Sequence, residues 1–324
     1  MKKKVLITGA SGFVGYHLVQ EALANDLEVV AAVRPSSKVD HLQSLPISFS
    51  TLDYTNVQKL AGDLKEKSYH YIIHAAGLTK AGSRQEYDKV NAVFTRNMAL
   101  AVKEAGIALE KFVLISSLAA LGPARPDQPC QPAGPLTAYG HSKLLAEQYL
   151  EQVDIPQIIL RPTAVYGPRE RDIFLMLKAI NRGFELYIGR FEQQLSFIHV
   201  SDLSAVAIKS LASPISNRSY VLSDGLSYDR YTLGNITREA LGKKTIRLHL
   251  PVGFTKLTVS AVETLFSLAG KIPTVNREKL NELTAANWFY GIDEAKRDLG
   301  FEPRYNLQEG IQQTLRWYKQ ERWI

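Results

Sequence analysis

Cysteine is almost absent from this sequence, in which Cys130 is the single thiol among 324 residues. One cysteine excludes a disulfide within the chain and is typical of proteins from a reducing compartment, so we expect a cytoplasmic location. Cys130 lies in a proline-rich stretch without histidine or cysteine at metal-ligand spacing. The sequence therefore predicts neither a disulfide framework nor a metal site.

Long hydrophobic runs are also missing. The apolar run at residues 5–7 is followed directly by polar residues and glycines, without the cleavage site that ends a signal peptide. Residues Val252–Ile272 are interrupted by Lys256 and Glu263, so they fall short of the roughly 18 uninterrupted apolar residues of a membrane span. We expect no membrane span, and we interpret this second segment as a core or pocket-lining helix.

No block of basic residues with interleaved aromatics occurs, although Lys and Arg outnumber Asp and Glu by 39 to 32. Nucleic acid is therefore not an expected partner, whereas the formal charge of +7 fits a small anionic ligand. Apolar residues at 45% and charged residues at 22% are typical of a globular protein. The length favours one large domain or two modest ones.

A glycine-rich turn follows the first predicted strand, Lys4–Thr8, and precedes a segment with helical periodicity, Tyr16–Ala24. Gly9 permits the tight turn, Gly12 lets a pyrophosphate approach the backbone, and Gly15 lets the helix pack on the strand. Free N–H groups and the dipole at the start of that helix favour the phosphates. The turn predicts a dinucleotide site that includes Gly9, Ser11, Gly12, Phe13, Val14 and Gly15.

An acidic residue is missing from the end of the second predicted strand, Glu28–Val33, where an NAD site usually holds the ribose 2′-hydroxyl. Arg34 stands there instead, and Lys38 follows four residues later. Guanidinium groups suit phosphate, so we favour NADP(H), with NAD(H) still possible. The alternative is that Arg34 is a solvated residue beside an adenine.

Further strands alternate with helices through the first half of the chain, at 47–52, 70–74, 111–115 and 157–160. This alternation predicts an α/β fold with a parallel, doubly wound sheet of the Rossmann type. Ligands bind at the carboxyl ends of such strands, where we expect these cofactor contacts: Asp53, Ala75, Ala76, Gly77 and Pro162. Asp53 would bond the adenine amino group or cap the next turn.

Tyr139 and Lys143 lie four residues apart at the start of a predicted helix, and so on one helical face. A phenol normally titrates near about 10, and a fixed cation nearby favours the phenolate. The pair therefore suits proton exchange with a hydroxyl or carbonyl group.

The second half of the chain contains further predicted elements. The residues Leu307–Gln320 and Ser201–Leu211 have helical spacing, and Thr245–Leu250 alternates as a strand.

Several longer motifs follow one another in a fixed order: Thr8-Gly9-x-x-Gly12-x-x-Gly15, His74-Ala75-Ala76-Gly77, Val90-Asn91, Ile115-Ser116-Ser117, Tyr139-x-x-x-Lys143, Arg161-Pro162-x-x-Val165-Tyr166-Gly167-Pro168, Phe197 to Leu203, and Asp293 to Pro303. Together these segments resemble the extended short-chain dehydrogenase/reductase family, of the NAD-dependent epimerase/dehydratase type. The resemblance implies a Rossmann-type domain, residues 1–168 plus about 196–224. A smaller, interleaved C-terminal α/β substrate domain would hold residues 169–195 and 225–324.

The resemblance also implies roles for three catalytic residues. Tyr139 would be the general acid/base, and Lys143 would hold the nicotinamide ribose and lower the pKa of the tyrosine. Ser117, five residues before Gly122 as in the family pattern, would hydrogen-bond the substrate oxygen. Ser116 would point away, because neighbouring residues of a strand alternate between its faces.

Three reaction types of the family compete. Sugar-nucleotide dehydratases carry Thr-Asp-Glu where this chain has Ser117-Leu118-Ala119, which disfavours dehydration. Nucleotide-sugar epimerases carry an Asn and an Arg facing the diphosphate where this chain has Ala164 and Leu195. Epimerase stays open as an alternative, because another arginine could substitute: Arg169, Arg171 or Arg190.

The third type resembles dihydroflavonol reductases and 3β-hydroxysteroid dehydrogenase-like enzymes. It fits Arg34, the apolar residues 118–121, and Phe254–Leu268, which would wall a site for an apolar alcohol or ketone unless it is ordinary core. We therefore predict an NADP(H)-dependent reductase/dehydrogenase that acts on a small molecule. The resemblance also suggests a homodimer, formed through the helices at Tyr87–Ala105 and Tyr139–Gln152. A non-catalytic dinucleotide sensor is the alternative from another class.

Overall fold

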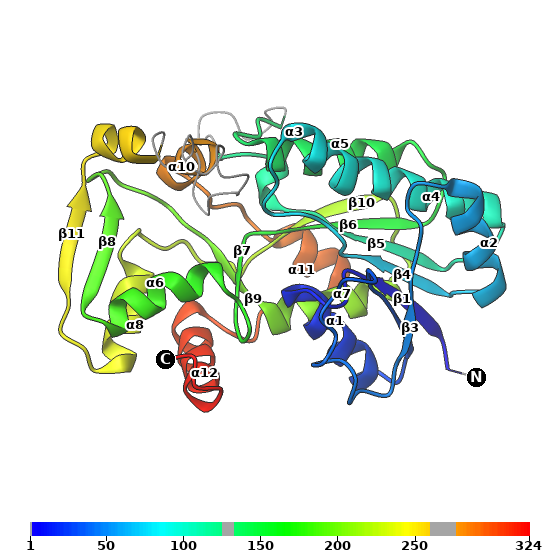
Figure 1. Cartoon of the computed structure of the whole chain (residues 1–324), viewed down its shortest axis with the longest axis horizontal. Coiled ribbons are helices and arrows are strands. Elements are labelled where there is room, and N and C mark those ends of the chain that lie inside the picture. Colours follow the sequence, from blue (N-terminus) through cyan, green and yellow to red (C-terminus); the bar gives the residue numbers. More distant parts are fainter. Residues whose placement is uncertain (1, 125–132, 260–276) are drawn as a thin grey trace.

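The computed structural model describes residues 2–124, 133–259 and 277–324. A seven-stranded sheet forms its centre, with the strand order β10-β6-β5-β4-β1-β2-β3 and every neighbouring pair parallel (Figure 1). The strands are β1 (Lys4–Thr8), β2 (Glu28–Ala32), β3 (Ser48–Ser50), β4 (Tyr71–His74), β5 (Lys111–Ile115), β6 (Gln157–Pro162) and β10 (Arg218–Leu222). The order reverses between β1 and β4, which is the switch point where ligands bind in such sheets.

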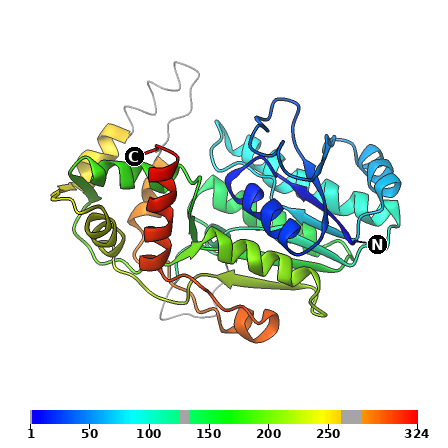
Figure 2. The same cartoon turned by 90° about the horizontal axis from the view of Figure 1, so that it is seen from below.

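Helices cover both faces of this sheet, which is why its central strands β1, β4 and β5 are buried along nearly their whole length. In β1, Val5 and Ile7 belong to one core and Leu6 to the other, since neighbouring side chains alternate between faces. The first face holds α1 (Phe13–Ala24), α7 (Val200–Leu211) and α11 (Asp293–Leu299). Figure 2 shows α1 in blue and α7 in yellow-green on this face. The second face holds α2 (Val57–Lys67), α4 (Phe94–Ala105) and α5 (Ala138–Glu151). The predicted α/β class and doubly wound parallel sheet are confirmed.

A smaller α/β unit adjoins the main sheet and has its own core, which includes Tyr166, Phe197, Ile311 and Tyr318. Its strands form two parallel pairs, β7 (Ala164–Tyr166) with β9 (Phe197–His199) and β8 (Phe184–Ile188) with β11 (Ile246–Leu250). Its helices include α6 (Asp172–Asn181), α8 (Thr232–Leu241), α10 (Arg277–Thr284) and α12 (Leu307–Gln320). The exact division of the chain into two domains stays a prediction.

The structure differs from the sequence-based expectations in several elements. The single helix expected at Tyr87–Ala105 is divided into α3 (Arg84–Tyr87), a π-helical segment η1 (Asp88–Val93) and α4. Neither β8 nor α10 was expected from its sequence pattern. Residues 252–259 are helical as expected for Phe254–Leu268, but the rest of that segment and Cys130 lie outside the described residues.

Within the described ranges, no helix is long and apolar enough to cross a membrane. No group of three or more His, Cys, Asp or Glu side chains there is arranged to hold a metal ion.

Candidate active site

The glycine turn between β1 and α1 has the geometry that a pyrophosphate requires. Gly9 has φ of +68°, and a Cβ atom there would lie 2.7 Å from the carbonyl oxygen of Ala75. A Cβ atom on Gly15 would overlap the carbonyl oxygen of Gly9, so this residue too must be glycine. Gly12 caps α1 without any side-chain hydrogen bond. The first N–H groups of α1 thus have no side-chain cap, which fits the phosphates of a dinucleotide.

The ends of β1 and β4 are joined through the hydroxyl of Thr8. Its oxygen accepts hydrogen bonds from the backbone N–H groups of Ala75 (3.1 Å) and Ala76 (3.0 Å) and lies 3.0 Å from Nδ1 of His74. His74 is fully buried, and burial lowers its pKa to about 3, so its ring is neutral. This network holds the backbone of Ala75–Gly77 beside the glycine turn.

Arg34 and Lys38 both lie exposed on the turn that follows β2. The carbonyl oxygen of Arg34 accepts a hydrogen bond from the Ser37 N–H (2.9 Å), which closes the turn. Neither basic side chain has a carboxylate within ion-pair distance in the part of the chain that the structure describes. The contact of both cations with a 2′-phosphate stays a prediction.

Asp53 uses one carboxylate oxygen to close a turn after β3. That oxygen accepts hydrogen bonds from the N–H (3.1 Å) and the hydroxyl (2.6 Å) of Thr55. These bonds to Thr55 lower the pKa of Asp53, and Lys59 lies 3.6 Å from the other oxygen. The turn-capping alternative for Asp53 is therefore present in the structure, and its contact with adenine stays a prediction.

Tyr139 and Ser117 meet because α5 begins against the short helix η2 (Leu118–Ala120). Thr137 caps α5 by accepting a hydrogen bond from the Gly140 N–H at 3.0 Å. A Cβ atom on Gly140 would overlap the carbonyl oxygen of Ala119, so only glycine permits this approach. Burial raises the pKa of Tyr139 to about 12, while hydrogen bonding with Ser117 opposes this rise.

Lys143 lies on the same face of α5 and reaches the cofactor edge of the sheet. Its Nζ donates a hydrogen bond to the carbonyl oxygen of Ile115 at 2.8 Å, and a Cβ atom on Gly77 would lie 3.6 Å from it. Burial lowers the pKa of Lys143 to about 8, and Glu147 opposes this. Burial dominates the pKa of Tyr139 in this structure, and the ammonium of Lys143 is held by the carbonyl oxygen of Ile115, so the expectation that Lys143 lowers the pKa of Tyr139 stays a prediction.

Ser116 points to the other side of β5, as alternation predicts. Its hydroxyl donates a short hydrogen bond to Glu147, which also pairs with Arg161 at 2.7 Å. Asn91 donates to the hydroxyl of Ser142 (2.9 Å) and to the carbonyl oxygen of Leu78 (3.0 Å), which fastens η1 to α5. These buried groups support the site, and Ser117 rather than Ser116 faces Tyr139.

Two features of the site have no counterpart in the sequence-based expectations. A carboxylate oxygen of Glu278, on α10, accepts a hydrogen bond from the Ala138 N–H at 2.7 Å, at the start of α5. The rings of Tyr87 and Tyr139 make an edge contact with centroids 6.1 Å apart. No local pattern predicts the contact of Glu278, because α10 lies 140 positions after Ala138. Tyr87 stood in an expected helix, but nothing in its spacing indicates its partner.

The three arginines considered for a sugar-nucleotide diphosphate lie in different places. The guanidinium of Arg169 lies 4.4 Å above the ring of Tyr16 on α1, and that of Arg171 lies 5.9 Å from the ring of Trp323. Arg190 is exposed after β8. Pro162 is buried at the end of β6, next to the cofactor edge.

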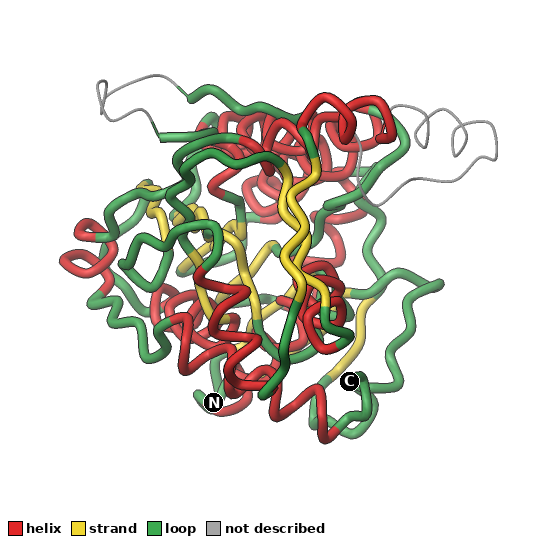
Figure 3. The backbone as a smooth tube through the Cα atoms, turned by 90° about the vertical axis from the view of Figure 1, so that its left-hand side faces the viewer, coloured by secondary structure: helices red, strands yellow, loops and turns green. Residues whose placement is uncertain are grey.

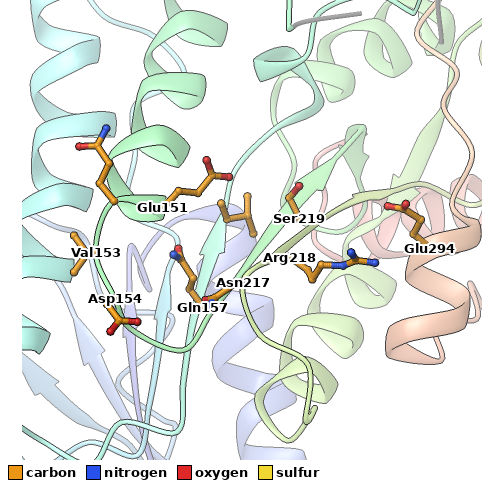
Figure 4. Close-up of a pocket in the computed structure, with 10 residues that line it drawn as sticks. Glu151, Val153, Asp154, Gln157, Asn217, Arg218, Ser219 and Glu294 are labelled. Carbon is orange, nitrogen blue, oxygen red and sulfur yellow. The ribbon is translucent and has the colours of Figure 1, made fainter. Parts of the chain in front are cut away.

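A cavity of about 530 Å³ opens elsewhere, between α5, β6 and β10 (Figure 4). It is lined by residues such as Asp154, Gln157, Asn217 and Arg218, at the starts of β6 and β10. Ligands of a parallel sheet bind at the carboxyl ends of its strands, whereas this cavity lies at the opposite, amino ends. It is therefore separate from the candidate active site.

A switch-point glycine turn, with a serine, a tyrosine and a lysine beside it, defines a dinucleotide-dependent α/β enzyme. The family model for the NAD-dependent epimerase/dehydratase family matches residues 5–223. The chain belongs to this family, which confirms the resemblance to extended short-chain dehydrogenases/reductases.

Individual relatives include both reductases and epimerases. The chain is 28% identical to a ceramide reductase of Caulobacter vibrioides over 99% of this chain and 96% of that protein. It is 27% identical to a UDP-glucose 4-epimerase of Vibrio cholerae over 99% and 97% of the two chains. Among solved structures, the crystal structure of gox2253 matches with a TM-score of 0.80 at 26% identity, covering 99% of both chains.

Proposed function

We propose that this protein is an NADP(H)-dependent reductase/dehydrogenase that interconverts a carbonyl and a secondary alcohol on a small organic substrate. The observation that carries the proposal is the position of Ser117 and Tyr139 in one site, with Lys143 beside Gly77 at the cofactor edge. The glycine turn and the backbone of Ala75–Gly77 fit a dinucleotide. That cofactor, when bound, supplies or accepts the hydride.

The residues of the chain supply the proton and the positioning. With a pKa of about 12, Tyr139 is a neutral phenol at physiological pH and can donate its proton to a substrate oxygen that gains negative charge. The Ser117 hydroxyl holds the same oxygen. Lys143, with a pKa of about 8, is charged near neutral pH and would hold the nicotinamide ribose. In the reverse direction the phenolate form accepts the proton.

The choice of a reductase over an epimerase rests on the residues that would face a diphosphate. Ala164 and Leu195 offer no polar side chain, and Arg169 and Arg171 are engaged by the rings of Tyr16 and Trp323. The ceramide reductase relative supports a reductase, and the UDP-glucose 4-epimerase relative keeps epimerase as the second candidate. Positions 118 and 119 hold leucine and alanine, so neither supplies the carboxyl group that would drive elimination.

Three finer statements belong to the same proposal. Arg34 and Lys38 would bind the 2′-phosphate of NADP(H), which makes it the preferred cofactor over NAD(H). The enzyme would work in the cytoplasm, as its single cysteine suggests. It would form a homodimer through the helices around Tyr87–Ala105 and Tyr139–Gln152.

The proposal is tested by following the nicotinamide absorbance of the purified protein. NADPH is mixed with a panel of apolar ketones and aldehydes, and in parallel with UDP-sugars. Oxidation of NADPH with an apolar carbonyl supports the reductase. Conversion of a UDP-sugar without net redox change would support the epimerase. Bound dinucleotide without turnover of either class would support a sensor and overturn the proposal.

A further inference from the structure

The strand pair β8–β11 exposes four large apolar side chains on one side. Phe184, Leu186, Ile246 and Leu248 are 46%, 52%, 61% and 41% exposed. The register pairs Phe184 with Ile246 and Leu186 with Leu248, so the four side chains form one continuous surface. We call these four residues the apolar face.

The opposite side of the same pair fixes this orientation. Glu185 is 1% exposed and forms ion pairs with Arg247 (2.8 Å) and Arg238 (3.2 Å). The hydroxyl of Tyr187 donates a further hydrogen bond to Glu185 at 3.0 Å. Turning the apolar residues inward would remove Glu185 from these ion pairs and hydrogen bonds. The interactions of Glu185 therefore keep the apolar face exposed.

The part of the chain that the structure describes leaves the apolar face uncovered. Figure 3 views the molecule from the side of β8 and β11, and the pair lies at the surface nearest the viewer. Two further exposed apolar residues, Phe254 (58%) and Leu257 (72%), lie on the helical segment that follows β11. Single exposed apolar residues are common, but a contiguous patch marks an interaction site.

Most of the net positive charge of the chain lies in the two segments that contain the apolar face. Segments 178–190 and 242–257, which contain β8 and β11, hold seven of the 39 Lys and Arg residues but one of the 32 Asp and Glu residues, the buried Glu185. The rest of the chain therefore has 32 basic and 31 acidic residues, which nearly cancel. Six of the seven net positive charges belong to these two segments, and Arg182, Lys243 and Lys244 are exposed at the start of the strands.

We propose that the apolar face docks on the surface of a bilayer that contains anionic phospholipids. The apolar side chains would enter the boundary between head groups and acyl chains, and the surrounding basic residues would contact the lipid phosphates. A second copy of this chain fits less well, because the symmetric contact would bring two strongly positive surfaces together. The docking is peripheral, it does not depend on the proposed reaction, and it needs no spanning helix.

Vesicle flotation of the full-length protein tests the proposal. We expect binding to phosphatidylcholine vesicles that contain about 30% phosphatidylglycerol, and little binding to phosphatidylcholine alone. Raising NaCl from about 50 mM to about 500 mM should release most of the protein, since salt screens the phosphate contacts. Equal binding to both kinds of vesicle, or none to either, would overturn the proposal.

Two double variants separate the apolar and the basic contributions. Leu186→Ser with Leu248→Ser and, separately, Lys243→Glu with Lys244→Glu should each lower the affinity for anionic vesicles at least about 10-fold. The matched controls are Leu226→Ser, at another exposed leucine, and Lys65→Glu with Lys103→Glu, on α2 and α4, which should bind as the wild type does. Thermal unfolding checks that each variant is folded. Undiminished vesicle binding by both face variants, or a dimer that the face variants dissociate, would refute the proposal.

Discussion

Tyr139 keeps its proton through the physiological range, because burial raises its pKa to about 12. A neutral phenol next to Ser117 is a hydrogen-bond donor, and general acid catalysis of this kind contributes about 10²–10⁴-fold to a rate. We therefore expect Tyr139→Phe to lower kcat by at least about 100-fold with an unchanged Kd for NADPH. Steady-state absorbance and nucleotide fluorescence measure the two quantities. Tyr149→Phe, on the same helix, is the control, and equal activity of both variants would exclude Tyr139 as the acid.

Lys143 gives the protein a pH dependence of its own. Its pKa is lowered to about 8, so the ammonium is charged below that pH and neutral above it. If it holds the nicotinamide ribose, the affinity for NADPH should be highest below pH 8 and fall several-fold as the pH rises through about 8 to 9.5. Tyr139, which titrates near 12, does not interfere. Lys143→Met should bind weakly with a flat profile, and a flat wild-type profile would contradict the role.

Arg34 decides the cofactor if it contacts a 2′-phosphate. A charge-assisted hydrogen bond contributes about 1.5–3 kcal/mol, so Arg34→Asp should raise the Kd for NADPH by roughly 10- to 100-fold and that for NADH far less. Titration of the intrinsic fluorescence with each nucleotide gives both constants. Arg316→Asp, at an exposed arginine on α12, controls for the change in net charge. Equal losses for the two nucleotides would mean that Arg34 does not touch the phosphate.

At the level of elements, patterns with one dominant cause were predicted well. The sequence indicated β1 and β5 with the bounds that the structure has, because strands buried on both faces are continuous apolar runs between turn residues. The strand β8 was not predicted, because its pattern is reversed. Its residues alternate, but the buried partner is Glu185 and the exposed ones are Phe184 and Leu186, the reverse of an ordinary strand. The ion pairs of Glu185 with the distant Arg247 and Arg238, together with its hydrogen bond from Tyr187, explain that inversion.

The candidate site divides in the same way. Gly9, Tyr139 and Lys143 were predicted because the role proposed for each depends on local spacing. Tyr139 and Lys143 are four residues apart on one helix, and the glycines of the turn that begins at Gly9 are three residues apart. The contact of Glu278 with the start of α5 depends on a long-range fold, which no local pattern contains. The pKa of Tyr139 also depends on the surroundings, since burial outweighs the hydrogen bond with Ser117.

The contact between α5 and η2 gives a test at this scale. Gly140→Ala would place a Cβ atom against the carbonyl oxygen of Ala119, and overpacking of this kind costs about 1–3 kcal/mol. We expect a lower Tm and a lower kcat, since Tyr139 moves with the start of α5. Gly62→Ala, on α2, has open space around it and should raise the stability by about 0.5–1 kcal/mol. A Gly140→Ala variant as stable as Gly62→Ala would show that this packing does not hold Tyr139.

For the whole molecule, the proposed dimer and the apolar face use different surfaces, and this makes them separable. Half-buried Leu145 and Tyr149 lie on α5, and the guanidinium of Arg96, on α4, lies 5.4 Å from the ring of Tyr149, so the two helices share one outer surface. If two copies pack there, Leu145→Glu with Tyr149→Glu should yield a monomer in sedimentation velocity experiments, because the contact would bury unpaired charges. The same variant should still bind anionic vesicles through β8–β11. A wild type that sediments as a monomer at every concentration would contradict the dimer, and loss of both properties in this one variant would show that the two surfaces are not independent.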